Sequence, residues 1–360
     1  MTRLDSSLSF RRGPALSNRI TLAPLTNFQS NDDGTLGEDE YRWIESRARS
    51  GYSLTMTCAA YVNENGKGFS GQLGISHDGH LAGLQRLAEV IREAGSVSSV
   101  QLQHSGMRAN PAFTGGAPVG PFADAKTGTL ALTTSQVEGL IADFVNAAVR
   151  AEKAGFQGAE LHGAHGYLLC QFLDADNNQR DDGYGGSLEN RSRMLLEVIR
   201  GIRQSTGKDF QLGLRLSPER WGIRTDEALS LAGQLMQGGQ LEYLDMSLWD
   251  CFKPARDERY ADTPLIDLFA ALPRGQTRLG VAGMIMGTAT AQACLDHGAD
   301  FVMIGRGAIL QTDFVAQTLS NPDFVSVPRP VTREWLASQH VGPTFVHYLA
   351  TAWADFVAAP

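Results

Sequence analysis

The residues best suited to chemistry lie together in one short segment, His162-Gly163-Ala164-His165-Gly166-Tyr167. Two imidazoles at this spacing can direct N–H donors at one carbonyl, nitro or phenolate oxygen and stabilise negative charge that develops there. The phenol of Tyr167 adds a candidate general acid. The segment therefore predicts an oxygen-binding site with a proton donor beside it.

Two other interpretations of the histidines stay open at this point. His162 and His165 could bind a metal ion, which would need a third ligand such as Asp, Glu or another His. Glu160 lies two residues before His162 and would point the same way along a strand. A metal site is the second interpretation after oxygen binding, and a structural role for both histidines is the third.

A long polar segment, 171–191, follows the histidines. It ends where Ser187 is well suited to cap the start of a helix. Its charged residues suggest a salt-bridged scaffold that makes the loop rigid, and we expect that structural role for Asp174, Arg180, Asp182 and Arg191.

Short apolar runs alternate with amphipathic helical segments along most of the chain. Strands are expected at 20–22, 54–58, 99–102, 158–161, 211–216, 243–247, 278–281 and 301–304. Helices are expected at 38–49, 81–93, 135–154, 188–205, 226–237, 265–272, 288–297 and 307–319. This alternation indicates parallel strands joined by helical crossovers. About eight such units favour an α/β fold of the (β/α)₈ TIM-barrel type, and no Gly-x-Gly-x-x-Gly follows a strand to favour the alternative, a doubly wound open sheet.

Three strand-to-helix connections are long: 103–134, 162–187 and 248–264. In a barrel they would all open on the carboxyl face, where ligands bind. The first is either a solvated excursion or a lid. We expect one barrel domain over residues 1–327 and a C-terminal extension over 328–360, whose aromatic residues predict packing on the barrel or on a neighbouring subunit.

Composition narrows the class of protein. Of the 360 residues, 42% are hydrophobic and 19% charged, so a large core is available. The net charge of −8 and the lack of a basic run argue against nucleic acid and anionic membranes as partners. The four cysteines lack zinc or iron–sulfur spacing. We found neither an apolar leader nor a run of bilayer length, so a cytoplasmic protein is expected.

Residues 162–191 contain three motifs, His-x-x-His-Gly-Tyr-Leu, Phe-Leu-Asp and Asn-x-Arg-x-Asp-x-Tyr-Gly-Gly-Ser-x-Glu-Asn-Arg. Through these motifs the chain resembles the Old Yellow Enzyme family of ene-reductases, and the resemblance is strongest there. It extends over nearly the whole barrel, through Asn18-Arg19-Ile20, Ala23-Pro24-Leu25-Thr26, Gln101-Leu102-Gln103-His104-Ser105-Gly106, Arg215-Leu216-Ser217, Ala282-Gly283-Met284 and Ile304-Gly305-Arg306. One departure is Ala175, where many members carry Pro, and we expect it to affect only loop stiffness.

The resemblance implies FMN, bound non-covalently across the mouth of the barrel. Thr26 would bind the flavin C4 carbonyl, and Arg215 would hold the negative charge of the reduced ring. Glycines would let the backbone approach the phosphate, with Arg306 supplying charge. The implied cofactor contacts are Pro24, Thr26, Ala59, Gln101, Arg215, Gly283, Met284, Gly305 and Arg306.

The implied activity is ping-pong reduction of a small electrophile by NADPH or NADH. After hydride passes from nicotinamide to FMN, an α,β-unsaturated carbonyl compound would bind through its oxygen to His162 and His165. Hydride from flavin N5 would reach Cβ, and Tyr167 would protonate Cα. Nitro compounds and nitrate esters fit the same oxygen site, and the expected apolar walls are Phe28, Tyr61, Trp249 and Phe252.

Two functions of other classes remain as alternatives. One is a metal-dependent barrel hydrolase that uses His162 and His165, and the other is a non-catalytic flavin-binding sensor. The sequence predicts a small-molecule partner and leaves a homo-oligomer open.

Overall fold

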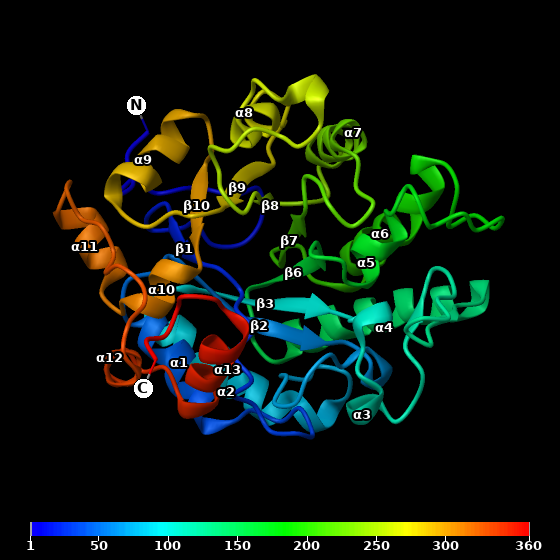
Figure 1. Cartoon of the computed structure of the whole chain (residues 1–360), viewed down its shortest axis with the longest axis horizontal. Coiled ribbons are helices and arrows are strands. Elements are labelled where there is room, and N and C mark those ends of the chain that lie inside the picture. The colour runs from blue at the N-terminus through cyan, green and yellow to red at the C-terminus, as the bar shows by residue number, and fades with distance from the viewer. Residues whose placement is uncertain (1, 360) are drawn as a thin grey trace.

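The computed structural model describes residues 2–359, and within them eight parallel strands close a barrel (Figure 1). Around the barrel the order is β1, β10, β9, β8, β7, β6, β3 and β2. These strands are β1 (Ile20–Leu22), β2 (Leu54–Tyr61), β3 (Val97–Gln103), β6 (Gly158–Gly163), β7 (Gln211–Leu216), β8 (Tyr243–Ser247), β9 (Arg278–Ala282) and β10 (Phe301–Ile304). The closed order confirms the expected (β/α)₈ fold and excludes the open sheet.

Helices follow the strands and form the outer layer, as parallel pairing requires. They are α1 (Glu38–Ala48), α2 (Leu81–Glu93), α4 (Thr134–Lys153), α6 (Leu188–Ser205), α7 (Thr225–Gln237), α8 (Leu265–Ala270), α9 (Thr288–Asp296), α10 (Arg306–Leu310) and α11 (Phe314–Ser320). Ser187 caps α6 as expected, since its hydroxyl accepts the Asn190 amide hydrogen at 3.3 Å. The helix boundaries lie close to the predicted ones except after β10.

The single helix predicted over 307–319 is wrong. The structure breaks it into α10 and α11, with Gln311 in an extended conformation between them. Side chains of distant segments explain the break: the Thr312 amide donates to Oε1 of Gln339 at 2.8 Å, and Oε1 of Gln311 accepts from the Val327 amide at 2.9 Å. Contacts with the C-terminal part of the chain therefore replace the helical bonds.

The long connection after β3 is mostly exposed to solvent between residues 111 and 131. It contains the 3₁₀ turn η3 (Gly106–Arg108), the short helix α3 (Pro111–Thr114) and two short paired strands, β4 (Val119–Gly120) and β5 (Leu130–Ala131). Three further 3₁₀ turns lie in other loops: η1 (Glu64–Gly66), η2 (Asp78–His80) and η4 (Glu258–Tyr260). Because much of 111–131 is exposed, this connection resembles a solvated excursion more than a closed lid.

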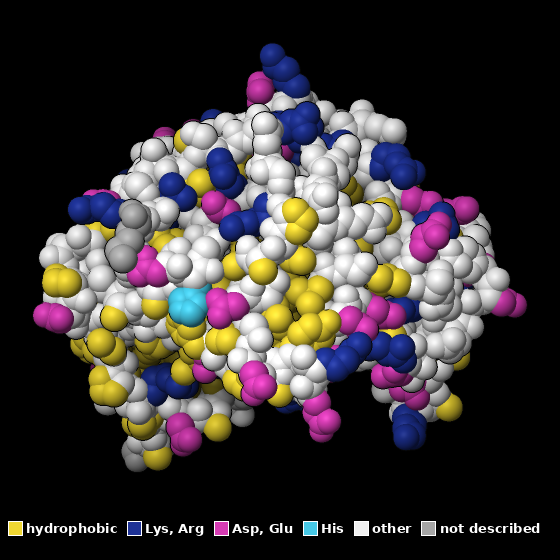
Figure 2. Space-filling model, turned by 90° about the horizontal axis from the view of Figure 1, so that it is seen from above, with side chains coloured by type: hydrophobic (Ala, Val, Ile, Leu, Met, Phe, Trp, Pro, Cys, Tyr) yellow, Lys and Arg dark blue, Asp and Glu magenta, His cyan; other side chains and the backbone are white. Residues whose placement is uncertain are grey.

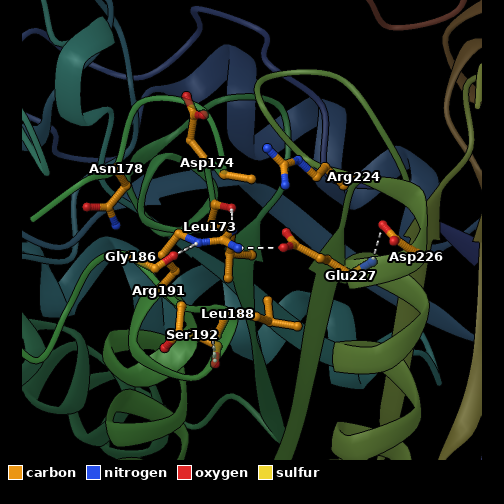
Figure 3. A network of polar contacts seen from close by, with 12 residues as sticks. Leu173, Asp174, Asn178, Gly186, Leu188, Arg191, Ser192, Arg224, Asp226 and Glu227 are labelled. Carbon is orange, nitrogen blue, oxygen red and sulfur yellow. Dashed lines mark hydrogen bonds and ion pairs between the residues drawn. The ribbon is translucent and has the colours of Figure 1, made fainter.

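The polar loop between β6 and α6 contains the short helix α5 (Leu168–Phe172) and the expected scaffold in part. Arg180 forms a two-bond ion pair with Asp182 at 3.0 and 2.6 Å. Arg191 instead pairs with Glu227 of α7 at 2.7 Å and donates to the carbonyls of Leu173 and Gly186 (Figure 3). Asp174 makes no ion pair among the described residues, since it caps a turn by accepting from the amides of Asp176 and Asn177.

The end of the chain packs on its own barrel through α12 (Arg333–Ser338) and α13 (Pro343–Ala352), which lie beside α10 and α1 (Figure 1). The Trp335 indole donates to the Leu310 carbonyl of α10 at 2.8 Å. Phe345 of α13 meets Trp43 of α1 edge-on at 5.4 Å. These contacts place the extension against the carboxyl face of the barrel.

The described surface carries mixed charge. Figure 2 shows acidic and basic side chains interspersed among apolar ones over one face of the molecule. In residues 2–359, every helix is too short or too polar to cross a membrane.

Asp182→Asn should destabilise the fold by loosening this loop. Hydrogen bonds from Arg180 lower the pKa of Asp182 from 3.8 to about 2. A depressed folded-state pKa means that the stabilisation is full above pH ~4 and is lost as pH falls toward ~2. With allowance for solvent screening, we expect a loss of about 1 kcal/mol, or about 2 °C in the melting temperature at pH 7.

Thermal melts of Asp182→Asn and wild type at pH 7 and pH 3 test this. The matched control is Asp181→Asn, which changes an exposed neighbour. A pH-independent difference between Asp182→Asn and wild type would contradict the ion-pair explanation.

Candidate active site

A cavity of about 660 Å³ opens at the carboxyl ends of the strands. This size is typical of small-molecule sites. Every expected cofactor contact lines it: Pro24, Thr26, Ala59, Gln101, Arg215, Gly283, Met284, Gly305 and Arg306. His162, His165, Tyr167 and Trp249 line the same cavity, so residues from distant parts of the chain meet in one place.

Three expected wall residues lie outside the cavity. Phe28 packs behind two lining residues, Phe69 and Tyr348, at 4.5 and 4.6 Å. Phe252 turns its ring to His297, at 5.2 Å on the outer side of the barrel. The Tyr61 hydroxyl donates to the Asp33 carbonyl in a buried position. Phe28 therefore supports two lining residues from outside the cavity, whereas Phe252 and Tyr61 have their contacts elsewhere.

Other lining residues were missed from the sequence. Trp221 and Arg108 come from the loops after β7 and β3, and Arg329, Tyr348 and Trp353 come from the end of the chain. The density of aromatic residues in the extension was a signal for the last two. No sequence pattern marked Arg108.

The rings of His162 and His165 lie together, as expected, but they are hydrogen-bonded to each other. Nδ1 of His162 accepts the Ala164 amide hydrogen at 3.3 Å, so the proton of the neutral ring lies on Nε2. That Nε2 lies 3.3 Å from Nδ1 of His165. Nε2 of His165 in turn lies 2.7 Å from the Ser247 hydroxyl. In this arrangement His162 donates a hydrogen bond to His165, and His165 donates one to the Ser247 hydroxyl.

Both imidazoles are neutral. Burial lowers the pKa of His162 to about 3, with a further decrease from the charges of Arg215 and Arg108. Burial also lowers the pKa of His165 well below its usual range, again helped by its charged and imidazole neighbours. Near neutral pH the pair can therefore donate hydrogen bonds without a net charge of its own.

An oxygen that takes a hydrogen bond from each ring requires a second arrangement of protons. His162 already has its proton on Nε2, whereas His165 would have to carry its proton on Nδ1. Nε2 of His165 would then need a donor. The Ser247 hydroxyl can fill this role because it can either accept or donate. Ser247 thus allows His162 and His165 to change from a pair that is hydrogen-bonded internally to a pair in which both rings donate to a ligand.

Tyr167 lies directly beside this pair, as the residue that precedes α5. Its ring meets the His162 ring edge-on at 4.9 Å, and the guanidinium carbon of Arg108 lies 4.7 Å from its centroid. Burial raises the pKa of the Tyr167 phenol, and Arg108 offsets part of that rise. The phenol therefore keeps its proton near neutral pH.

The floor of the cavity is a buried charged network. Arg215 of β7 lies 3.1 Å from Asp245 of β8, without hydrogen-bond alignment. Gln101 donates to Glu160 at 2.8 Å. Burial and the charge of Asp245 raise the pKa of Glu160 to about 8, so this carboxyl holds a proton near neutrality. Gln101 and Arg215 thus have buried partners and also line the cavity.

The residues at the far end of the cavity fit the phosphate of FMN. Arg306 and Arg329 both line it, and burial together with the charge of Arg329 lowers the pKa of Arg306. The buried Nε of Arg306 has no hydrogen-bond partner among the described residues. At Gly283 a Cβ would lie 2.9 Å from the Asp250 amide nitrogen, so only glycine fits there. Two cations and a free donor suit a dianionic group.

Several lining residues hold rare backbone conformations. His165, Trp221, Trp249 and Met284 all have positive φ angles, of 61°, 51°, 65° and 50°. Such residues cost free energy and cluster at functional sites. The fold holds these side chains in orientations that an unstrained loop would not give.

The metal interpretation is not favoured. Among the described residues, the grouping with three potential ligands close enough to share an ion is Glu64, His77 and His80, in the loops after β2. Among the same described residues, neither His162 nor His165 belongs to such a grouping.

Ser247→Ala should weaken the binding of phenols to the histidine pair. The variant removes the group that would satisfy Nε2 of His165 in the two-donor arrangement, so the dissociation constant should rise about three- to tenfold. Ser247→Thr keeps a hydroxyl and should bind nearly as wild type. Titration calorimetry gives the constants, and ¹⁵N shifts of the His165 ring report its tautomer.

Ser217→Ala is the matched control, since the Ser217 hydroxyl contacts only the His165 backbone amide, at 3.0 Å. If Ser247→Ala leaves both the affinity and the ring shifts unchanged, the hydroxyl does not set the tautomer.

Known proteins are similar to this chain in both sequence and fold. A family model described as the NADH:flavin oxidoreductase / NADH oxidase family matches residues 10–321. An NADPH dehydrogenase of Bacillus subtilis (strain 168) is 33% identical over 89% of this chain and 95% of its own length. NADH:fumarate oxidoreductase of Klebsiella pneumoniae (strain 342) is 35% identical over 88% of this chain. NADH:acrylate oxidoreductase of Vibrio harveyi is 32% identical over 89%. The chain spans only 36% and 33% of these two longer relatives.

Solved structures agree. The old yellow enzyme homologue from Zymomonas mobilis superposes with a TM-score of 0.81 at 25% identity, covering 96% of this chain and 99% of the other. Morphinone reductase in complex with tetrahydroNAD gives a TM-score of 0.78 at 27% identity, covering 97% of each. From the family match and these relatives, the chain belongs to the NADH:flavin oxidoreductase / NADH oxidase family, the Old Yellow Enzymes.

Proposed function

We propose that the protein is an NAD(P)H-dependent FMN oxidoreductase that reduces the activated C=C bond of α,β-unsaturated carbonyl compounds. The observation that carries the proposal is the meeting of two neutral imidazoles and a protonated phenol on one wall of the cavity. The names of two relatives support it, because fumarate and acrylate both carry a C=C bond next to a carboxyl group.

The overall reduction adds one hydride and one proton across the double bond. When bound, FMN supplies the hydride chemistry and takes its electrons from NADH or NADPH. The chain's own task is to bind the substrate oxygen and to deliver the proton. His162 and His165 would stabilise the negative charge that grows on the oxygen, with no desolvation of an ionic group of their own.

Tyr167 is proposed as the proton donor to Cα. Its phenol lies against His162 and keeps its proton near neutral pH. The α-carbon of an enolate is a strong base, so a fixed phenol can protonate it in spite of a raised pKa.

The remaining walls suit a flat substrate. Trp221 and Trp249 lie 6.3 Å apart at a tilt of 36°, and the His165 ring lies 5.9 Å from Trp221. This geometry supports Trp249 as a wall of the substrate site, and Trp221 would add a second aromatic face. Nitro compounds and nitrate esters offer similar oxygen acceptors and are proposed as further substrates.

Replacement of both His162 and His165 by Ala should abolish the long-wavelength absorbance that a phenol produces on binding to the oxidised enzyme. Two donors favour the phenolate, and its electron-rich ring would give a charge-transfer band with bound oxidised flavin. Each lost bond to a charged oxygen weakens binding, so affinity should fall at least ~100-fold. Spectral titration measures both effects, with His297→Ala as the remote control. An unchanged band in the double variant would place the oxygen site elsewhere.

Tyr167→Phe should slow reoxidation of the reduced enzyme by an enone by about 10²–10⁴-fold, the usual contribution of a positioned general acid. Reduction by NAD(P)H should be nearly unaffected, because that half-reaction transfers no proton to a substrate carbon. Nitro substrates, protonated on atoms that exchange with solvent, should suffer less.

Stopped-flow absorbance of the flavin separates the two half-reactions. Equal losses in both would mean that Tyr167 supports structure or cofactor binding, and the proton would then come from another donor.

A further inference from the structure

The charge inside the cavity is opposite to the charge of the chain. The chain carries a net charge of −8, yet the charged Lys, Arg, Asp or Glu side chains among its described lining residues are four arginines. Three of these arginines already have a role in the site described above. Arg215 is paired with Asp245, and Arg306 and Arg329 form the end of the cavity that fits a phosphate. Arg108 is left without a counter-charge.

The position of Arg108 is fixed, although the side chain is exposed at the mouth. It is the last residue of η3, and its Nη1 donates to the His165 carbonyl at 2.6 Å. Its guanidinium also lies over the Tyr167 ring. These contacts use one of five N–H donors, and no carboxylate of residues 2–359 forms a salt bridge with it.

Arg108 faces the reacting groups and not the phosphate end. Its charge lowers the pKa values of both His162 and His165 and limits the rise at Tyr167. Arg306, in contrast, is affected by Arg329. The cavity thus has two separate cationic ends.

We propose that Arg108 is a specificity-determining residue that binds a carboxylate of the substrate. The preferred substrates are then unsaturated carbonyl compounds that carry a carboxylate within a few bonds of the double bond. The carbonyl oxygen lies at the His162–His165 pair while the carboxylate takes the free edge of the guanidinium, a fork that suits two carboxylate oxygens. This inference rests on the proposed function.

A phosphate of NADH or NADPH is the other anion that could reach the mouth. Its chemistry toward a guanidinium is similar, so the two sources must be separated by experiment. They act in different half-reactions: the dinucleotide binds during reduction of the enzyme, and the unsaturated compound binds during its reoxidation.

The test uses two substrates that differ in one charge, monomethyl fumarate and dimethyl fumarate. Reoxidation of the reduced holoenzyme is followed by stopped flow over a range of concentrations, for wild type, Arg108→Gln and Arg108→Lys. Arg108→Gln should raise the apparent dissociation constant of monomethyl fumarate roughly 10–100-fold and leave that of dimethyl fumarate within about twofold. Arg108→Lys should retain most of the affinity. Added salt should weaken monomethyl fumarate binding only when the cation is present.

The control is Arg86→Gln, which removes an exposed arginine of α2 that is paired with Glu38. Equal losses for both esters in Arg108→Gln would overturn the proposal, because Arg108 would then act through the His165 carbonyl and the Tyr167 ring. The proposal would also be overturned if Arg108→Gln slowed only the reduction of the enzyme by NADH or NADPH, because Arg108 would then bind a phosphate of the dinucleotide. The proposed function fails separately, if neither ester nor a neutral enone reoxidises the wild type.

Discussion

The arrangement of the whole site depends on one buried cation, Arg215. The register of β7 with its neighbours places it next to His162 of β6 on one side and Asp245 of β8 on the other. A buried guanidinium requires a counter-charge, and Asp245 supplies it. Glu160 can lie in the same network because it takes up a proton. The floor therefore carries a defined charge pattern before any ligand binds.

The charges of this buried network set the protonation of the histidine pair beside it. Because positive charge and burial both disfavour imidazolium, we expect the histidine pair to respond to a ligand by moving protons between ring nitrogens and not by gaining charge. A serine hydroxyl that can donate or accept permits this exchange without any movement of the backbone. Strained φ angles at His165 and Trp221 hold the rings in place, which is the kind of preorganisation that reduces the reorganisation cost during catalysis.

The sequence predicted the barrel well because short apolar strands and capped helices are local properties. Four of the eight barrel strands begin and end where expected, β7 and β8 among them. The break between α10 and α11 could not be predicted, since it is made by Gln339, which lies far along the chain. The resemblance located the polar residues of the cavity through their motifs. The expectation that Phe28 and Phe252 line the cavity was wrong, because the direction of a loop side chain follows from a backbone turn that aromatic residues do not signal.

The C-terminal extension has a consequence for how the cavity forms. Arg329, Tyr348 and Trp353 line the cavity, so one of its walls comes from residues that follow all eight barrel strands in the chain. The barrel sheet can therefore close before that wall is in place, and the cavity is then open on one side. Because a bound ligand stabilises only the state that binds it, a chain cut before Arg329 should gain less protection from proteolysis when cofactor is added.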